Sequence, residues 1–151
     1  MAGLSSLPVA IVGAGPFGLS VAAHLRSYGV PFRIFGTPMH RWLEQMPAGM
    51  FLKSDWDASS LADPDKHFTL REFCADSGLI YGNGPLPLHT FTSYALSFQR
   101  RLVPMVEDIM VTALDRTSDG FVIKLANGEG ISAKRVVIAT GLSHAEYVPQ
   151  E

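Results

Sequence analysis

The sequence has a single cysteine, no strong excess of either charge and no long hydrophobic run. One cysteine, Cys74, among 151 residues excludes an internal disulfide and favours a reducing compartment. With 12 basic and 14 acidic residues, the net charge of -2 provides no basic surface for nucleic acid or an anionic membrane. No apolar run is long enough to cross a bilayer, and residues 1–8 lack the features of a secretion signal. We therefore expect a cytoplasmic protein without nucleic-acid or membrane partners.

Histidine spacing and hydrophobic content indicate what kind of protein this is. The five histidines show no metal-ligand spacing, so we expect no metal site. Hydrophobic residues make up 47% of the chain, a proportion typical of globular domains, and 151 residues are enough to bury a core. The sequence therefore predicts one folded domain.

The stretch at residues 8–18, PVAIVGAGPFG, predicts a strand, a glycine turn and a helix in succession. Residues 9–12 form a short apolar run, which is typical of a strand buried on both faces. Gly13, Gly15 and Gly18 follow with G-x-G-x-x-G spacing, and helical periodicity comes next. A glycine-rich turn alone is weak support for a nucleotide site, but this order of elements is the one that dinucleotide binding requires.

Each glycine of this motif has its own physical role. Gly13 allows the tight turn off the strand, Gly15 lets the backbone approach a pyrophosphate, and Gly18 lets the helix pack close to the sheet. The free N–H groups and the positive end of the helix then face the two phosphates. We therefore expect a dinucleotide site here, with an empty structural turn as the alternative.

The end of the second strand departs from the dinucleotide-binding pattern. Residues 32–35 predict this strand, which completes a β-α-β unit and a dinucleotide motif over residues 8–36. An acidic residue normally follows and binds the ribose hydroxyls. This chain has Gly36 there, and no acidic residue occurs over residues 31–43 to take over the role.

Two arginines near this strand leave the identity of the nucleotide open. Arg33 and Arg41 can accommodate a ribose 2′-phosphate, which makes NADP an alternative to FAD. Alternatively, Thr37 or backbone groups can meet the ribose of a flavin nucleotide. Both arginines can also be simply solvated.

Residues 37–104 predict a helical insertion that begins with a long loop. Residues 39–61 are rich in Met, Trp, Phe and Pro and show little periodicity, as in loops and lids with a function. The aromatic side chains of this loop can cover a flat ring system or serve as ordinary packing. Lys53 can act electrostatically near a flavin or be merely exposed.

Two helices complete the insertion. Thr69 and Glu72 have the spacing of a capping box for a helix that covers residues 70–78. A second helix begins at Thr90 or Thr92 and ends before the next proline.

Residues 105–141 change to an extended pattern. Three strands are predicted, at residues 106–116, 120–125 and 131–140, and turn sequences join them. The first two form an antiparallel hairpin beside the parallel sheet, and the last returns to the central sheet. We therefore predict an α/β fold: a Rossmann-like FAD/NAD(P)-binding domain with a parallel central sheet, an antiparallel β-meander and inserted helices.

The order and separation of these motifs resemble a known family. The GAGPFG turn, the tryptophan-containing loop, the two helices, the antiparallel strands and the closing VVIATG resemble the N-terminal FAD-binding part of flavoproteins with two dinucleotide-binding domains. Within this group the chain is most similar to the flavin-containing monooxygenases and their Baeyer-Villiger and N-hydroxylating relatives. The resemblance spans residues 9–141. It implies FAD as cofactor and, in the full-length protein, NADPH as reductant and oxygen transfer to a small-molecule substrate.

The resemblance also assigns positions around the FAD. It places an aromatic ring near the flavin at Trp42, a backbone contact with the adenine near Val111, and a small-residue approach at Thr140 and Gly141. Gly36 departs from the acidic ribose ligand of the family. No catalytic side chain is proposed. The cofactor-binding residues that we expect are Gly13, Ala14, Gly15, Pro16, Phe17, Gly18, Gly36, Arg41, Trp42, Val111, Thr140 and Gly141.

The length of the chain is a second departure from the family. A second glycine motif, for the nicotinamide nucleotide, would begin near residue 151, and none occurs in these residues. We therefore expect residues 1–151 to be a partial FAD/NAD(P)-binding domain, a fragment that is inactive alone. A standalone NADP-binding redox module and a non-catalytic flavoprotein remnant are the alternatives. The oligomeric state stays open.

Overall fold

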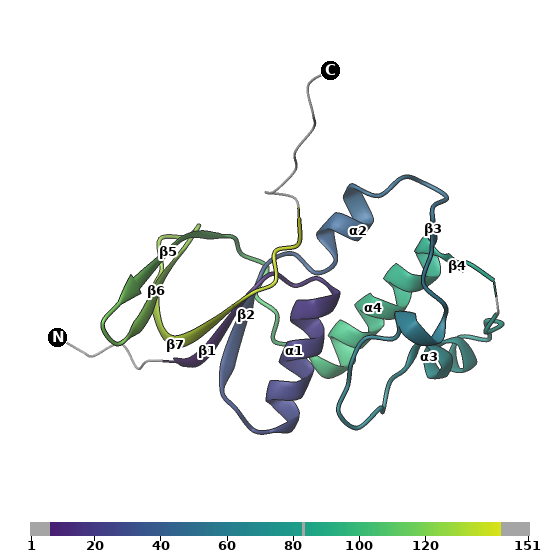
Figure 1. Cartoon of the computed structure of the whole chain (residues 1–151), viewed down its shortest axis with the longest axis horizontal. Helices are drawn as coiled ribbons and strands as arrows, with labels where there is room; N and C mark the ends of the chain where they lie inside the picture. The colour runs from purple at the N-terminus through teal and green to yellow at the C-terminus, as the bar shows by residue number, and fades with distance from the viewer. Residues whose placement is uncertain (1–6, 83, 143–151) are drawn as a thin grey trace, which may run out of the picture.

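Strands are interleaved with helices over residues 7–102, and further strands follow. The computed structural model describes residues 7–82 and 84–142. Its elements, in chain order, are β1 (Leu7–Val12), α1 (Pro16–Ser27), β2 (Phe32–Phe35), α2 (His40–Glu44), β3 (Phe51–Leu52), the short helix η1 (Asp57–Ser59), α3 (Leu70–Asp76), β4 (Leu86–Pro87), α4 (Leu88–Leu102), β5 (Val111–Thr117), β6 (Gly120–Leu125) and β7 (Gly130–Ile138). Figure 1 shows the larger sheet on one side, α3 and α4 on the other, and α1 between them. The predicted α/β fold with inserted helices is confirmed.

One five-stranded sheet, in the order β2-β1-β7-β6-β5, contains both parallel and antiparallel strands. β1 pairs in parallel with β2 on one side and with β7 on the other. β6 pairs antiparallel with both β7 and β5. The predicted return of the last strand to the parallel sheet is therefore confirmed. The β-meander continues that same sheet rather than lying beside it, because β7 pairs with β1 along one edge and with β6 along the other.

Helix α1 begins at Pro16, earlier than its hydrophobic periodicity predicts. Proline suits the first turn because its N–H is not needed there and its fixed φ is already helical. The helix ends before Gly29, which adopts a left-handed φ of +65°. The N–H groups of Gly29 and Val30 donate to the carbonyls of Arg26 and Leu25, which is the pattern of a Schellman motif.

The helical layer packs around Tyr94 on α4, which is completely buried. Its hydroxyl donates to the carbonyl of Phe68 and accepts from the N–H of Leu61, each at 3.0 Å. The rings of Phe73 and Phe98 lie 5.8 and 6.3 Å from its ring. Burial raises the pKa of Tyr94 to about 12. Tyr94 therefore stays neutral and links α4 to the segment that precedes α3.

Both predicted helices of the insertion are present. The capping box of α3 is confirmed, because the Thr69 side chain accepts from the N–H of Glu72 and the Glu72 carboxylate accepts from the N–H of Thr69. α4 begins at Leu88 rather than at Thr90 or Thr92. Neither threonine caps the helix, because both are buried in its interior and Thr92 donates to a carbonyl of the same helix.

Residues 39–61 contain α2, β3 and η1, which the sequence pattern does not predict. β3 pairs with β4, so that Leu52 lies opposite Leu86. The indole N–H of Trp56 donates to the carbonyl of Gly84 at 2.7 Å. Because these contacts join residues far apart in the sequence, no local pattern reveals them.

Membrane-spanning helices, metal-binding groups and the environment of Cys74 can be assessed for the described residues. Within residues 7–82 and 84–142, no helix has the length and hydrophobicity needed to cross a lipid bilayer. The same residues contain no group of three or more His, Cys, Asp or Glu that could hold a metal ion.

Cys74 is completely buried, and burial raises the pKa of its thiol. This cysteine therefore packs as a small apolar side chain.

Candidate functional site

The carboxyl ends of β1, β2 and β7 meet at the glycine motif. The N–H of Gly13 donates to the carbonyl of Phe35, and the N–H of Ala139 donates to the carbonyl of Val12, each at 2.8 Å. Gly13 has a φ of +111°, and a Cβ there would overlap the carbonyl oxygen of Ala139. Only glycine fits this turn. Ligands of open α/β sheets bind at this end of the parallel strands.

Gly18 and Gly15 differ in what surrounds their α-carbons. A Cβ at Gly18 would overlap the carbonyl oxygen of Gly13, so α1 approaches the turn only because position 18 has no side chain. A Cβ at Gly15 would have no protein atom within 4 Å. The backbone at Gly15 therefore faces open space, and packing within the protein does not explain a glycine at this position.

The N-terminus of α1 has no side-chain cap at Gly15 and no acidic residue in its first turn. Ala14, just before it, is buried, whereas Phe17 is 82% exposed. Pro16 stands in the first turn and has no N–H. No side chain of the first turn therefore compensates the positive end of the helix dipole, which is the arrangement that binds phosphates.

Gly36 lies directly against the glycine motif. Its φ is +126°, and a Cβ there would lie 3.4 Å from the nitrogen of Ala14 and 3.6 Å from the α-carbon of Gly13. The N–H of Gly36 donates to the carbonyl of Glu107 at 2.9 Å. Both the backbone conformation and the nearby motif favour glycine, so position 36 contributes backbone where the dinucleotide-binding pattern has an acidic side chain.

Arg33 is paired with two carboxylates from distant parts of the chain. Its Nε and Nη2 donate to the two carboxylate oxygens of Glu107 at 2.7 Å, and its Nη1 donates to Glu129 at 2.7 Å. The hydrogen bonds to Glu107 and Glu129 raise the pKa of the Arg33 guanidinium, and the bond from Arg33 lowers the pKa of Glu129. Two acidic partners therefore already neutralise the charge of Arg33. A role of Arg33 or Arg41 at a ribose 2′-phosphate stays a prediction.

Acidic residues that the sequence pattern did not single out lie beside the end of β2. Glu107 forms a parallel bridge with Phe35. The carboxylate of Asp108 accepts a hydrogen bond from the hydroxyl of Thr37 at 2.5 Å, across 71 positions of sequence. Because the two segments are so far apart in the chain, no local signal could have indicated that they meet.

Trp42, expected near a flavin ring, lines a pocket of about 510 Å³. The pocket lies between α2, residues 48–51 and the start of α4. The Trp42 ring packs edge-on against Phe91 at 4.8 Å. Arg41 precedes Trp42 in α2, and its carbonyl accepts from the N–H of Gln45. Arg41 and Trp42 therefore stand on a different element from the glycine motif.

The remaining expected residues lie at strand ends. The nitrogen of Thr140 would be 3.0 Å from a Cβ on Gly13, and Gly141 follows with a φ of +71°. Val111 begins β5 and pairs with Leu125 at the far edge of the sheet. The structure therefore brings Thr140 to the glycine motif, whereas Val111 is connected to the end of β2 by residues 107–110. Residues 143–151 lie outside the described part of the chain.

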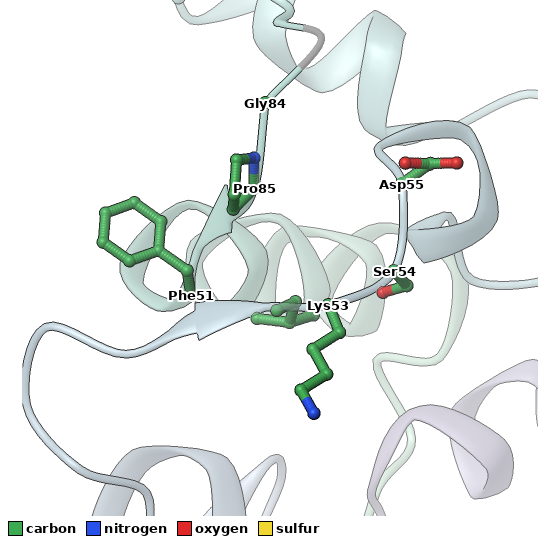
Figure 2. Close-up of a pocket in the computed structure, with 7 residues that line it drawn as sticks. Phe51, Lys53, Ser54, Asp55, Gly84 and Pro85 are labelled. Atoms are coloured by element: carbon green, nitrogen blue, oxygen red, sulfur yellow. The ribbon is translucent and has the colours of Figure 1, made fainter.

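A second pocket, of about 330 Å³, lies by β3 and β4. Figure 2 shows Phe51 on β3 and Pro85 just before β4, with the Lys53 side chain extending away from both. The hydroxyl of Ser54, beside Lys53, is 2.8 Å from the hydroxyl of Ser59. Lys53 is exposed in the structure. Its predicted electrostatic action near a flavin stays a prediction.

Several solved structures share this fold. A flavin-containing monooxygenase from Stenotrophomonas maltophilia has a TM-score of 0.77 and 21% identity, over 96% of this chain and 41% of that protein. The bacillithiol disulfide reductase Bdr (YpdA) from Staphylococcus aureus has a TM-score of 0.72 and 19% identity, over 90% and 38%. OTEMO, in a complex with FAD and NADP, has a TM-score of 0.70 and 16% identity, over 89% and 26%.

At these identities the similarity concerns the fold alone, and the chain spans less than half of each of these proteins. No curated protein sequence matches the chain significantly. The family model described as pyridine nucleotide-disulphide oxidoreductase matches residues 7–151, which is nearly the whole chain. The protein therefore belongs to the pyridine nucleotide-disulphide oxidoreductase family.

Proposed function

We propose that this chain is the FAD-binding portion of an NADPH-dependent flavoprotein oxidoreductase, a monooxygenase in its complete form. The observation that carries the proposal is the contrast among the three motif glycines. Contacts within the protein explain Gly13 and Gly18, but Gly15 faces open space at the uncapped start of α1. A pyrophosphate approaching the backbone of Gly15 gives this glycine its physical reason.

The residues present fit two parts of an FAD molecule, the central pyrophosphate and the flavin ring. The turn at Gly15 and the N-terminus of α1 would hold the pyrophosphate, and Thr140 and Gly141 would flank it. Trp42 and its pocket would cover the flavin ring and keep water from one side of it. When bound, FAD supplies hydride acceptance and oxygen chemistry, so the protein contributes binding, orientation and the exclusion of water.

The alternatives have less support from this chain. A standalone NADP-binding module needs a basic group for the 2′-phosphate, and Arg33 already pairs with Glu107 and Glu129. Disulfide reduction by the chain itself needs a reactive thiol, and Cys74 is buried with a raised pKa. A non-catalytic flavoprotein remnant would still bind FAD. Only the activity of the complete protein distinguishes such a remnant from the FAD-binding portion of an active oxidoreductase.

The partners of the complete protein follow from the same proposal. OTEMO has the same fold and is described as a complex with FAD and NADP. Because this chain covers only part of such proteins, NADPH and the small-molecule substrate would bind mainly to the remaining parts. The net charge of -2 supports a protein without nucleic-acid or membrane partners, and the single cysteine supports a cytoplasmic location.

Titration of the 151-residue chain with FAD, followed by flavin fluorescence, tests the proposal. Wild type should bind FAD, and Gly15→Ala should weaken FAD binding by about tenfold or more, because the added methyl group occupies the approach of the pyrophosphate. Gly130→Ala is the matched control, since a Cβ there also meets no protein atom within 4 Å.

The chain alone should not oxidise NADPH, even with FAD added. Tighter binding of NADP than of FAD would overturn the assignment. Equal FAD affinities of wild type and Gly15→Ala would remove its main support.

A further inference from the structure

A short extended segment at Glu107 and Asp108 continues the sheet beyond β2. The N–H of Glu107 donates to the carbonyl of Ile34, and the N–H of Gly36 donates to the carbonyl of Glu107, both at 2.9 Å. The segment therefore runs parallel to β2. Because the carboxyl ends of parallel strands lie at one edge of a sheet, Asp108 emerges beside Gly36 at the same edge as the glycine motif.

The carboxylate of Asp108 is exposed and is held in place by Thr37. The hydroxyl of Thr37 donates to its Oδ1 at 2.5 Å. An ionised carboxylate has about four lone-pair sites, so this bond leaves acceptor sites for further donors. Thr37 directly follows Gly36, and the carboxylate is thus fixed next to the position that carries the acidic ribose ligand in dinucleotide-binding folds.

We propose that Asp108 takes the role of the acidic residue absent at position 36 and accepts hydrogen bonds from the adenosine ribose hydroxyls of FAD. This inference rests on the proposed FAD-binding function. The two adjacent hydroxyls of a ribose provide two donors for the two oxygens of a carboxylate. An acidic side chain at position 36 would crowd Ala14 and adopt a strained φ, whereas Asp108 reaches the same edge from another segment.

The charges around Asp108 favour a ribose with free hydroxyls over one with a 2′-phosphate. Arg33 pairs with both Glu107 and Glu129, so these residues together with Asp108 carry one positive and three negative charges. A phosphate next to Asp108 would be repelled and would offer it no hydroxyl donor. The edge of the sheet therefore selects FAD over NADP at the glycine motif.

Titration of the 151-residue chain with FAD measures the contribution of Asp108. Asp108→Ala should weaken FAD binding about tenfold, because hydrogen bonds to a charged acceptor are lost. Asp108→Asn is a second variant that keeps the side-chain size and removes the charge. Asp115→Ala, at an exposed aspartate on β5, is the matched control and should bind FAD like wild type. Thermal unfolding without ligand identifies any variant that fails to fold.

Calorimetry with adenosine nucleotides isolates the ribose contact. Wild type should bind ADP more tightly than 2′-deoxy-ADP or adenosine 2′,5′-bisphosphate, and Asp108→Asn should reduce both preferences. Unchanged FAD affinity in both Asp108 variants would overturn this inference and leave the proposed function standing. Tighter binding of the 2′,5′-bisphosphate than of ADP would also overturn it and would favour basic residues such as Arg41. Wild type that binds no FAD would overturn the proposed function and this inference together.

Discussion

Arg33 on β2 and Glu107, which are 74 positions apart, form a bidentate ion pair in which Nε and Nη2 each donate to a carboxylate oxygen at 2.7 Å. The remaining Nη1 reaches Glu129 in the turn between β6 and β7. The guanidinium of Arg33 therefore joins β2 to two segments from the second half of the chain. Because Glu107 directly precedes Asp108, the same ion pair holds the backbone beside Asp108.

Replacing Arg33 should destabilise the fold at the edge of the sheet. Arg33→Ala is expected to lower the free energy of unfolding by about 1–2 kcal/mol, because a partly exposed bidentate network is lost. Arg33→Lys keeps the charge but not the fork of donors and should recover only part of the loss. Urea unfolding measures these differences. Arg116→Ala, at an exposed arginine on β5, is the control, and an equal effect of both alanine variants would contradict the structural role of Arg33.

Alanine substitutions at Gly18 and Gly15 should differ in their effect on the stability of the ligand-free protein. Gly18→Ala is expected to cost about 1–3 kcal/mol, because the new Cβ overlaps the carbonyl oxygen of Gly13 and forces α1 away from the turn. Gly15→Ala should change stability by less than about 1 kcal/mol, since no protein atom is near. Thermal unfolding of the ligand-free variants compares the two. A larger loss at Gly15 than at Gly18 would contradict this arrangement.

Removing the hydroxyl of Tyr94 should weaken the helical layer. Tyr94→Phe leaves the N–H of Leu61 and the carbonyl of Phe68 without this partner in the interior, at an expected cost of about 1–3 kcal/mol. Tyr28→Phe, at a tyrosine that is 69% exposed, should have almost no effect on denaturant unfolding.

Tyr94 should also make stability depend on alkaline pH. Its pKa is raised from 10.0 to about 12, chiefly by burial, so the folded state disfavours the phenolate. The resulting stabilisation is complete below pH 10 and is lost as the pH rises from 10 towards about 12. Unfolding curves over this range should fall less steeply with pH in Tyr94→Phe than in wild type. An identical pH dependence in both proteins would show that Tyr94 does not titrate on unfolding.

The capping box of α3 should contribute measurably to stability. Thr69→Ala removes the side-chain acceptor for the N–H of Glu72 and should cost about 1 kcal/mol. Thr117→Ala, at an exposed threonine that ends β5, serves as the control in thermal unfolding. If the two substitutions have the same effect, the cap does not stabilise α3.

The two tryptophans allow the flavin position to be tested by fluorescence. Trp42 lines the pocket next to α2, whereas Trp56 contacts the ring of Tyr81 and the carbonyl of Gly84. FAD should quench the emission of Trp56→Phe, which retains only Trp42, more strongly than that of Trp42→Phe. The reverse order would place the flavin away from the Trp42 pocket.

Local sequence was sufficient to predict the elements whose stabilising contacts lie within a few residues. The apolar run before Gly13 and the reciprocal cap of Thr69 and Glu72 both depend on near neighbours. The glycine spacing likewise predicts a strand, a turn and a helix because backbone sterics at Gly13 and Gly18 allow no side chain. The start of α4 was predicted too late, since its threonines resemble caps but are buried in the helix interior.

The sequence by itself therefore determined the α/β order of elements and the glycine motif. Only the tertiary structure decided that Arg33 is neutralised by Glu107 and Glu129, and that Asp108 stands beside Gly36. The physical reason is that these interactions join segments some 70 or more positions apart. Such pairs form only when the packing of the whole sheet brings strand ends together, and neither periodicity nor local spacing records that packing.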